Sequence, residues 1–192
     1  MNYLACSETE SIMNERTTEE LITTLGNDIS RSHDELISAI DAGDVDSNGD
    51  VDADYEYHGR QLIRAIFAFI EAVTFSVKVN AAGFCLEHNL DISDAERFFA
   101  VDIEYVLTDK GAVVERQAHI RLAENIRFAF ALQEKAHGIA NRFDPSVEWW
   151  SHLKSSIKVR DRLMHPKFPE DIDISGAEII AASKHMKALS SN

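Results

Sequence analysis

The chain has 192 residues, and its 33 acidic residues against 19 lysines and arginines give a formal net charge of −14. Because an acidic surface repels phosphates, this charge argues against a nucleic-acid binder unless basic residues gather in one place. Cys6 and Cys85 are too few for a disulfide framework, and Glu71 interrupts the longest apolar stretch, which argues against a membrane span. We therefore expect a compact cytoplasmic protein without a membrane partner.

The acidic charge is concentrated in the N-terminal part of the chain. Residues 1–56 carry a net charge of −13, whereas residues 57–192 carry −1. We therefore expect an acidic N-terminal arm over 1–56 and a helical bundle over 57–192. Within the arm, Thr17 or Thr18 followed by glutamates is a helix-start signal, and the apolar spacing predicts one helix, or two, at about 18–41.

The stretch from Asp44 to Tyr55 has two interpretations. The order of its first seven positions matches that of a calcium-binding loop, with ligand-type residues at Asp44, Asp46, Asn48 and Asp50 and a glycine at Gly49. Tyr55 stands where the loop requires a bidentate glutamate, and no second loop exists to pair with it. The missing ligand favours a solvated acidic linker over a calcium site.

A central helix is predicted from Tyr57 onward, because apolar residues recur at helical spacing. They are Leu62, Ile63, Ile66, Phe67, Ile70, Val73 and Val77. Glu71 stands one turn from both Phe67 and Phe75 on this helix. Glu71 is either a partly exposed carboxylate that pairs with nearby cations, or the partner of a buried cation from elsewhere in the chain.

From Ser93 onward, the chain contains several residues that signal the start or the end of a helix. Ser93 with Glu96 forms a capping box that predicts a helix through about Leu107, although residues 104–116 could instead form a hairpin because valines flank a turn. A further helix is predicted from about Glu115 to His137, where Gly138 ends it. Ser175 and Glu178 then cap a short final helix that ends near Leu189.

The stretch from Leu153 to Lys167 contains the residues that point to a chemical function. Asp144-Pro145 predicts the start of its helix, and one of the adjacent tryptophans, Trp149 and Trp150, should pack in the core. Leu153, Ile157, Arg160 and Met164 follow one another at steps of four, three and four, the spacing of one buried stripe. A guanidinium in such a stripe requires a carboxylate, a phosphate or a partner subunit, because it cannot lose its proton.

Arg160 and His165 resemble the signature of the HEPN superfamily, which is an arginine, a polar residue, a few further residues and a histidine near the end of a helix. Here Asp161 takes the polar position, and Pro166 ends the helix directly after His165. The segment 153–167 carries a net charge of +4, whereas the whole body, residues 57–192, carries −1. The resemblance covers roughly residues 56 to 170 and implies an all-α, HEPN-like bundle of about five to six helices.

The resemblance implies a metal-independent endoribonuclease without a cofactor. It assigns Arg160, His165 and Asp161 to catalysis at the interface of a homodimer, with 2′-OH attack on the adjacent phosphorus. We expect Glu71 to support Arg160, and the basic side chains of the segment to bind RNA; these are Lys154, Lys158, Arg162 and Lys167. The resemblance also points to a toxin or antiphage role, and to an antitoxin or nucleotidyltransferase as a partner.

Two alternatives remain at this point. The chain could be a non-catalytic HEPN module that binds a nucleotide or a protein partner, or Arg160 and His165 could be an ion-paired arginine and a helix end in an unrelated bundle. The sequence contains no HExxH, P-loop, GxGxxG or GxSxG motif, and two cysteines do not make a zinc site. Metal, dinucleotide and serine-hydrolase chemistry therefore lack a motif here.

Overall fold

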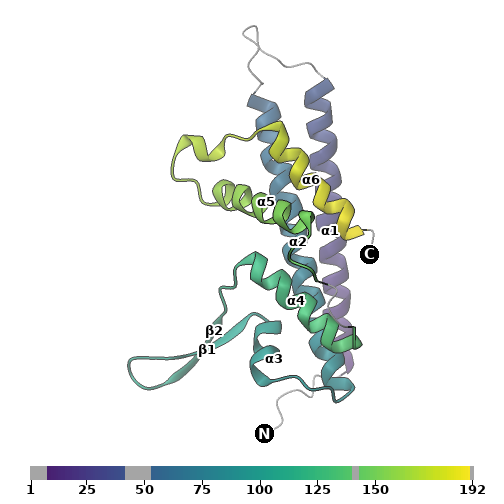
Figure 1. The fold of residues 1–192 in the computed structure, drawn as a ribbon, viewed down its shortest axis with the longest axis vertical. Helices are drawn as coiled ribbons and strands as arrows, with labels where there is room; N and C mark the ends of the chain where they lie inside the picture. Colours follow the sequence, from purple (N-terminus) through teal and green to yellow (C-terminus); the bar gives the residue numbers. More distant parts are fainter. Residues whose placement is uncertain (1–7, 42–52, 140–142, 191–192) are drawn as a thin grey trace. The chain divides into compact units, whose positions relative to one another are not determined.

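A computed structural model describes residues 8–41, 53–139 and 143–190, which contain six α-helices, one 3-10 helix (η1) and one two-stranded sheet (Figure 1). In chain order the elements are α1 (Glu8–Asp41), α2 (Ala53–Glu87), α3 (Asp94–Ala100), β1 (Ile103–Leu107), β2 (Val113–Gln117), α4 (Leu122–His137), α5 (Glu148–Met164), η1 (Pro169–Ile172) and α6 (Gly176–Ser190). The predicted all-α bundle of five to six helices is confirmed. Residues 44–52 of the predicted calcium loop lie outside the described ranges.

The chain divides into two compact units. Unit 1 comprises residues 1–72 and 148–192, and unit 2 comprises residues 73–147. Helix α2 runs through both units. Helix α1 belongs to the same unit as α5 and α6.

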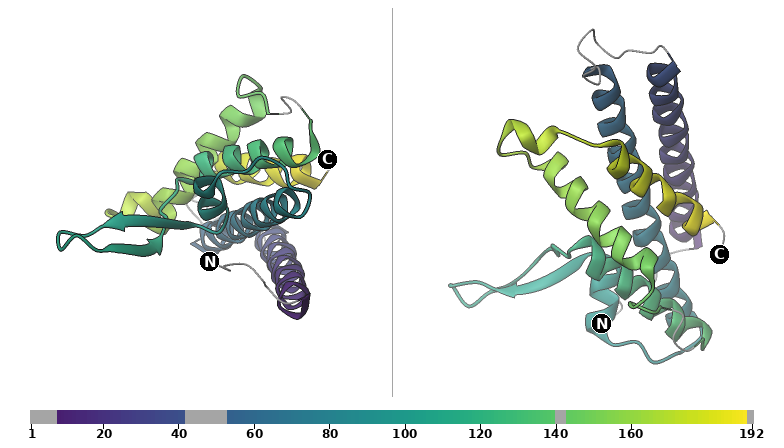
Figure 2. Two further views of the ribbon diagram at one scale, coloured as in Figure 1. Left: turned by 90° about the horizontal axis from the view of Figure 1, so that it is seen from below. Right: turned by 45° about the horizontal axis from the view of Figure 1, so that its top comes forward.

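In unit 1, α1 lies beside the first part of α2 (Figures 1 and 2). Leu36 of α1 is only 4% exposed, and a Cβ at Gly26 would lie 3.9 Å from the Phe69 ring of α2. His58 Nδ1 of α2 lies 3.6 Å from Glu35 Oε2 of α1. The helix predicted at about 18–41 is thus present as one continuous helix that begins earlier, at Glu8, and it packs on α2.

The core of unit 1 is built from α2, α5 and α6. Helix α2 contributes the apolar face predicted for the central helix, with five side chains that are at most 3% exposed: Leu62, Ile63, Ile66, Phe67 and Ile70. Each such burial contributes about 1.5–3 kcal/mol. Gly59 lies where α6 approaches α2, since a Cβ there would come within 2.6 Å of the Cδ1 atoms of Ile174 and Ile179. A glycine at this position therefore permits close packing of these isoleucines on α2.

Unit 2 has a smaller core that is rich in alanine. Its buried members come from α2, α3 and α4: Ala81, Ala82, Cys85, Ala100, Leu132 and Ala136. Phe84, Ile92 and Phe128 pack against this cluster. Burial raises the pKa of the Cys85 thiol, which is fully enclosed. These small side chains let the helices of this unit approach one another closely.

A β-hairpin replaces the helix that was predicted to continue through Leu107. Strands β1 and β2 pair antiparallel, from Ile103 opposite Gln117 to Leu107 opposite Val113, so the hairpin alternative is correct. Helix α3 ends at Ala100 because Asp102 adopts a left-handed conformation with φ of 54°, which a continuing helix does not allow. The helix predicted from about Glu115 begins only at Leu122, because residues 113–117 form strand β2 of this hairpin.

Three predicted helix signals are present, and one lies in the wrong place. The capping boxes of Ser93 with Glu96 and of Ser175 with Glu178 both form, and Gly138 ends α4 with a left-handed φ of 63°. The predicted start of α5 is wrong. Asp144 Oδ1 accepts a hydrogen bond from the Ser146 N–H at 2.8 Å in a turn, and the helix begins only at Glu148.

Candidate active site

Helix α5 carries the residues of the predicted motif, and its buried face differs from the expected stripe by one position. Met164, predicted to be buried, is 45% exposed, and Leu163 is buried in its place at 1% exposure. Because one residue turns a helix by about 100°, this shift moves the edge of the buried face. The Arg160 side chain is 21% exposed, so it lies at that edge rather than inside the core. Of the two tryptophans, Trp150 is in the core at 3% exposure, as expected for one of the pair.

Two carboxylates hold the Arg160 guanidinium. Its Nη2 donates to Glu71 Oε1 on α2, and its Nη1 donates to Asp161 Oδ1 at 2.9 Å. The contact between Glu71 and Arg160, one of the two interpretations of Glu71, is therefore present. The carboxylates compensate for the partial desolvation of the cation, and both remain accessible, with side chains 42% and 56% exposed. The three groups together carry a net charge of −1.

His165 is exposed and follows directly after the last residue of α5. Its backbone N–H donates to the Asp161 carbonyl at 3.1 Å and so continues the helical pattern by one residue. Pro166 ends the pattern, because it lacks an N–H and disfavours helical geometry in the residue before it. Five residues of regular helix separate Arg160 from His165, which turns their directions apart by about 140°.

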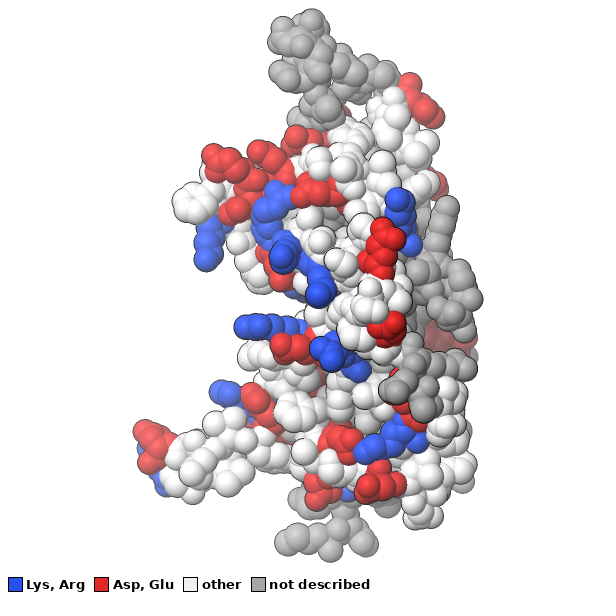
Figure 3. Space-filling model, viewed as in Figure 1, with Lys and Arg blue, Asp and Glu red and all other residues white. Residues whose placement is uncertain are grey.

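Three of the four predicted RNA-binding side chains are exposed: Lys154, Lys158 and Lys167. Figure 3 shows basic side chains gathered over α5, with acidic side chains beside them over η1 and the start of α6. The basic segment expected from the sequence is therefore a surface feature of unit 1, and an acidic neighbour limits its extent.

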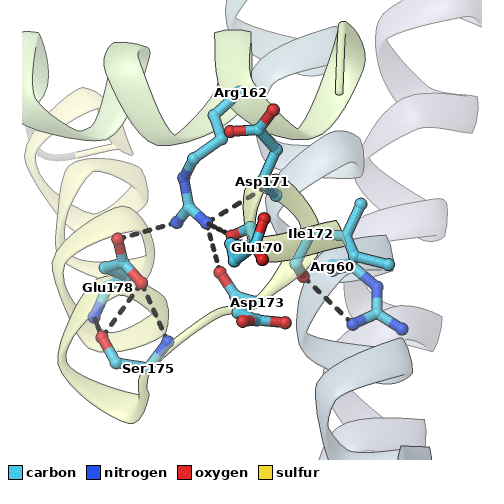
Figure 4. A network of polar contacts seen from close by, with 8 residues as sticks. All are labelled: Arg60, Arg162, Glu170, Asp171, Ile172, Asp173, Ser175 and Glu178. Atoms are coloured by element: carbon cyan, nitrogen blue, oxygen red, sulfur yellow. Dashed lines mark hydrogen bonds and ion pairs between the residues drawn. The ribbon is translucent and has the colours of Figure 1, made fainter. Parts of the chain in front are cut away.

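Arg162, predicted to bind RNA, makes a set of contacts within the fold. Its Nη1 donates to the backbone carbonyls of Glu170 at 3.3 Å, Asp171 at 3.1 Å and Asp173, and its Nη2 donates to Glu178 Oε1 at 2.9 Å (Figure 4). The guanidinium thus joins α5, η1 and α6 within unit 1. These donors hold the fold together, and the prediction that Arg162 binds RNA remains a prediction.

Unit 2 contains a buried lysine that was not among the predicted site residues. Lys78 is fully enclosed, and its Nζ donates to Asp102 Oδ1 and, at 3.2 Å, to the Phe99 carbonyl. A signal was available, because Thr74, Lys78, Ala81 and Cys85 follow one another at steps of four, three and four. This is the same spacing that identified Arg160, and it identifies a second cation on a buried helix face.

A second ion pair in unit 2 connects α3 to α4. Lys135 Nζ lies 2.7 Å from Glu96 Oε1, while Glu96 Oε2 accepts the Ser93 N–H at 2.8 Å. The hydrogen bond from Lys135, followed by that from the Ser93 backbone, lowers the pKa of Glu96 from its ordinary value to about 2. The same hydrogen bond raises the pKa of Lys135. One carboxylate therefore serves both as a helix cap and as a link between two helices.

In the described parts of the chain, no group of three or more His, Cys, Asp or Glu side chains is arranged to hold a metal ion. None of the described helices combines the length and the apolar character needed to cross a membrane. No protein-family model matches the chain, and no curated protein or solved structure matches it. The function is therefore argued from the residues themselves.

Proposed function

We propose that this chain is a metal-independent endoribonuclease of the HEPN type that acts as a homodimer. The observation that carries the proposal is the state of Arg160, which Glu71 anchors from another helix while the guanidinium stays about one-fifth exposed (21%). Exposed His165 closes the same helix, and exposed Lys154, Lys158 and Lys167 supply positive charge around it. A fixed arginine, an exposed histidine and further cations can support RNA cleavage by 2′-OH attack, as a charge stabiliser, a general acid or base and a phosphate-binding surface.

The proposed reaction is a transesterification followed by release of one product end. The 2′ oxygen forms a bond to the adjacent phosphorus as the bond from phosphorus to the 5′ oxygen breaks. Either His165 takes the proton of the 2′-OH while water protonates the departing 5′ oxygen, or water takes the 2′-OH proton while His165 protonates the 5′ oxygen. In both cases one proton is removed and one is supplied. The remaining N–H donors of Arg160 stabilise the charge on the phosphoryl oxygens, and Asp161 orients the guanidinium. The products are a 2′,3′-cyclic phosphate and a 5′-hydroxyl.

Two copies of α5 are part of the proposal. Because Arg160 and His165 point about 140° apart on one helix, a single copy does not direct both at one phosphate. Two helices that face each other across a two-fold axis place Arg160 of one copy opposite His165 of the other, and the converse. The site is therefore complete only in the dimer.

The test is cleavage of RNA in EDTA by the wild type and by the His165→Ala and Arg160→Ala variants. We expect each variant to lose activity by about 10²- to 10⁴-fold, as for the removal of a general acid or base. End-group analysis should find cyclic phosphate, and size-exclusion chromatography should find a dimer for every variant. His152→Ala is the matched control, since His152 is an exposed histidine on the same helix that contacts Glu148 at 3.1 Å. Full activity in His165→Ala would contradict the proposal.

A second candidate is a non-catalytic HEPN module that binds a nucleotide or a protein partner, such as an antitoxin or a nucleotidyltransferase. The observation that favours its protein-binding form is that carboxylates already bond both Nη atoms of Arg160, so an incoming phosphate meets a cluster of net charge −1. A folded dimer that neither cleaves RNA in EDTA nor binds a ribonucleotide in equilibrium dialysis would support a protein-binding module against the ribonuclease.

A further inference from the structure

The β-hairpin of unit 2 is anchored at its base by the buried Lys78. Asp102, which precedes β1, accepts a hydrogen bond from Lys78 Nζ on its carboxylate and one from the Ala118 N–H, at 2.8 Å, on its carbonyl. Lys78 Nζ also donates to the Phe99 carbonyl near the end of α3 at 3.2 Å. An isolated two-stranded hairpin is only marginally stable in water. The anchor therefore supplies stability that the two strands lack by themselves.

Contacts between the side chains of β1 and β2 fix the register of the hairpin. Arg116 Nε donates to Glu104 Oε1 at 2.7 Å on one face, and Tyr105 O–H donates to Glu115 Oε2 at 3.1 Å on the other. The five residues of β1 pair with the five residues of β2 in sequence, so the ladder contains no bulge. The edges of this small sheet are thus preorganised before anything binds to them.

The outer edge of β2 directs unpaired backbone groups to solvent. The Ala118 N–H bonds the Asp102 carbonyl, and the Thr108 N–H bonds the Ala112 carbonyl at 2.8 Å. Because antiparallel strands alternate between residues that bond inward and residues that point outward, every second residue of β2 turns its N–H and C=O away from β1. These residues are Val113, Glu115 and Gln117. Among the described residues, β1 is the only strand that pairs with β2.

This edge lacks the usual protection against a further strand. Edge strands are commonly blocked by a proline, a bulge or a covering element, whereas β2 contains no proline and all five of its residues are exposed. The turn of the hairpin stands away from α3 and α4 of the same unit (Figures 1 and 2). Val113 is 67% exposed opposite Leu107, which is 68% exposed, and Val114 is 42% exposed on the other face. An added strand would shield these apolar side chains from water.

The side chains of β2 specify the chemistry of such a strand. Antiparallel addition is the more stable arrangement, and each added residue then lies beside one residue of β2 on the same face. Glu115 favours a basic neighbour, Arg116 favours an acidic one, and Val113 and Val114 favour apolar ones. Read from its N-terminus, the added strand therefore carries an acidic residue, a basic residue and two apolar residues.

The same charges disfavour a second copy of this chain as the occupant. Two antiparallel strands related by a two-fold axis pair their central residue with its own counterpart. If the whole of β2 pairs in this way, Glu115 lies opposite Glu115, because it is the third of the five residues. Like charges directly opposite each other are destabilising. The edge is therefore better matched to a different polypeptide.

We propose that the outer edge of β2 binds an extended segment of a partner protein as a third, antiparallel strand. The segment has the order acidic, basic, apolar, apolar, opposite Arg116, Glu115, Val114 and Val113. Backbone hydrogen bonds to Val113, Glu115 and Gln117 hold it, and the side-chain pairs select it. This site lies within unit 2 and does not depend on the chemistry proposed for Arg160 and His165.

The test measures fluorescence anisotropy of a labelled hexapeptide, Thr-Glu-Lys-Val-Val-Thr, with the full-length protein. Its lysine lies opposite Glu115, so the lysine N–H faces β2, whereas the N–H of its glutamate points away. N-methylation of the lysine nitrogen should weaken binding by about tenfold or more, because it removes a donor at the edge. N-methylation of the glutamate nitrogen is the matched control and should change the affinity by less than about twofold. Both peptides are measured with unaltered protein, so folding of a variant does not enter.

Two variants of the protein test the assignment of Glu115. Replacement of the peptide lysine by glutamate should weaken binding to the wild type about three- to fivefold, and Glu115→Lys should reverse this preference. Glu115→Pro removes an N–H that points away from β1, so it should block the edge without breaking the hairpin. Glu115→Gln keeps that N–H and is its control, with most of the affinity retained.

Each outcome decides for or against the added strand. Absence of binding by the hexapeptide, or equal affinities of the two N-methylated peptides, would overturn the inference. An unchanged preference in Glu115→Lys would overturn the antiparallel register. A wild-type oligomer that becomes smaller in Glu115→Pro, seen by size-exclusion chromatography, would show that a second copy occupies the edge and would also overturn the inference. RNA cleavage is not part of these measurements, so the proposed function stands or fails separately.

Discussion

Lys78 on α2 and Arg160 on α5 both occur among residues spaced by four, three and four, yet the two cations differ in their access to solvent. Lys78 is fully enclosed and bonded to one carboxylate and one carbonyl. Arg160 stays 21% exposed and is bonded to two carboxylates that are themselves accessible. The spacing shows that a cation lies on a buried face, but the depth of that face decides whether its charge can meet a ligand. Lys78 is a structural link of unit 2, whereas Arg160 remains partly open to solvent.

The largest expected effect tests whether the difference in exposure matters for stability, and it is measured by removing each of the two cations. We expect Lys78→Met to lower the free energy of unfolding by about 2–4 kcal/mol, because it leaves the Asp102 carboxylate without its cation. Arg160→Met should cost only about 1 kcal/mol, because its partners are accessible to water. Urea unfolding of both variants measures the difference.

The double variant Lys78→Met/Asp102→Asn is the control for this measurement. It removes the unpaired carboxylate, and asparagine tolerates the left-handed backbone of Asp102, so part of the loss should be recovered. Equal losses of stability for Lys78→Met and Arg160→Met would show that exposure does not separate the two sites.

A second test changes Glu71, the carboxylate that holds Arg160 in place. Glu71→Gln keeps the shape of the side chain but weakens its hold on the guanidinium, and we expect RNA cleavage to fall about 10- to 100-fold through misplacement of Arg160. Stability should change by less than about 1 kcal/mol. Glu87→Gln, at an exposed position on the same helix, is the matched control. Unchanged cleavage by Glu71→Gln would show that Glu71 is not part of the site.

The smallest expected effect concerns the ion pair between Glu96 and Lys135 in unit 2. The pKa of Glu96 is about 2 in the folded chain, below its ordinary value of 4.5, so the carboxylate stabilises the fold above about pH 4.5. This contribution is lost as the pH falls from about 4.5 to 2. After allowance for solvent screening, Glu96→Gln should cost about 1–2 kcal/mol at pH 7. Urea unfolding at pH 7, 4 and 3 should show the gap between the two proteins closing, and a constant gap would contradict this assignment.

Much of the fold could be predicted, because its signals are local. The capping boxes at Ser93 and Ser175, the left-handed Gly138 and the apolar face of α2 are all present. The hairpin was only one of two interpretations, since short valine-rich segments do not distinguish helix from strand. The sequence also did not show that Leu163 is buried rather than Met164. This depends on which side chains in the last turn of α5 are covered by other elements.

The candidate site was predicted in part for a related reason. The contact between Arg160 and Glu71 was predicted although the two residues lie 89 positions apart in the sequence, because a guanidinium on a buried stripe needs a carboxylate. The role of Arg162 was missed, since three of its acceptor residues offer backbone carbonyls, and carbonyls have no residue-specific signal in the sequence. A basic residue in a charged run therefore cannot be assigned to a ligand from its charge alone.

Arg162, Arg60 and Asp171 hold the turn between α5 and α6 by hydrogen bonds, and this arginine clamp also bears on proteolysis. The peptide bond after Lys167 is a trypsin site on an exposed turn, and such turns are the usual places of nicking. A protease requires an extended strand, and this turn can supply one only by breaking the bonds from Asp171, Arg162 and Arg60 together. Cleavage at this bond therefore reports the opening of the clamp as a unit, and its rate follows the population of that open state rather than the exposure of Lys167.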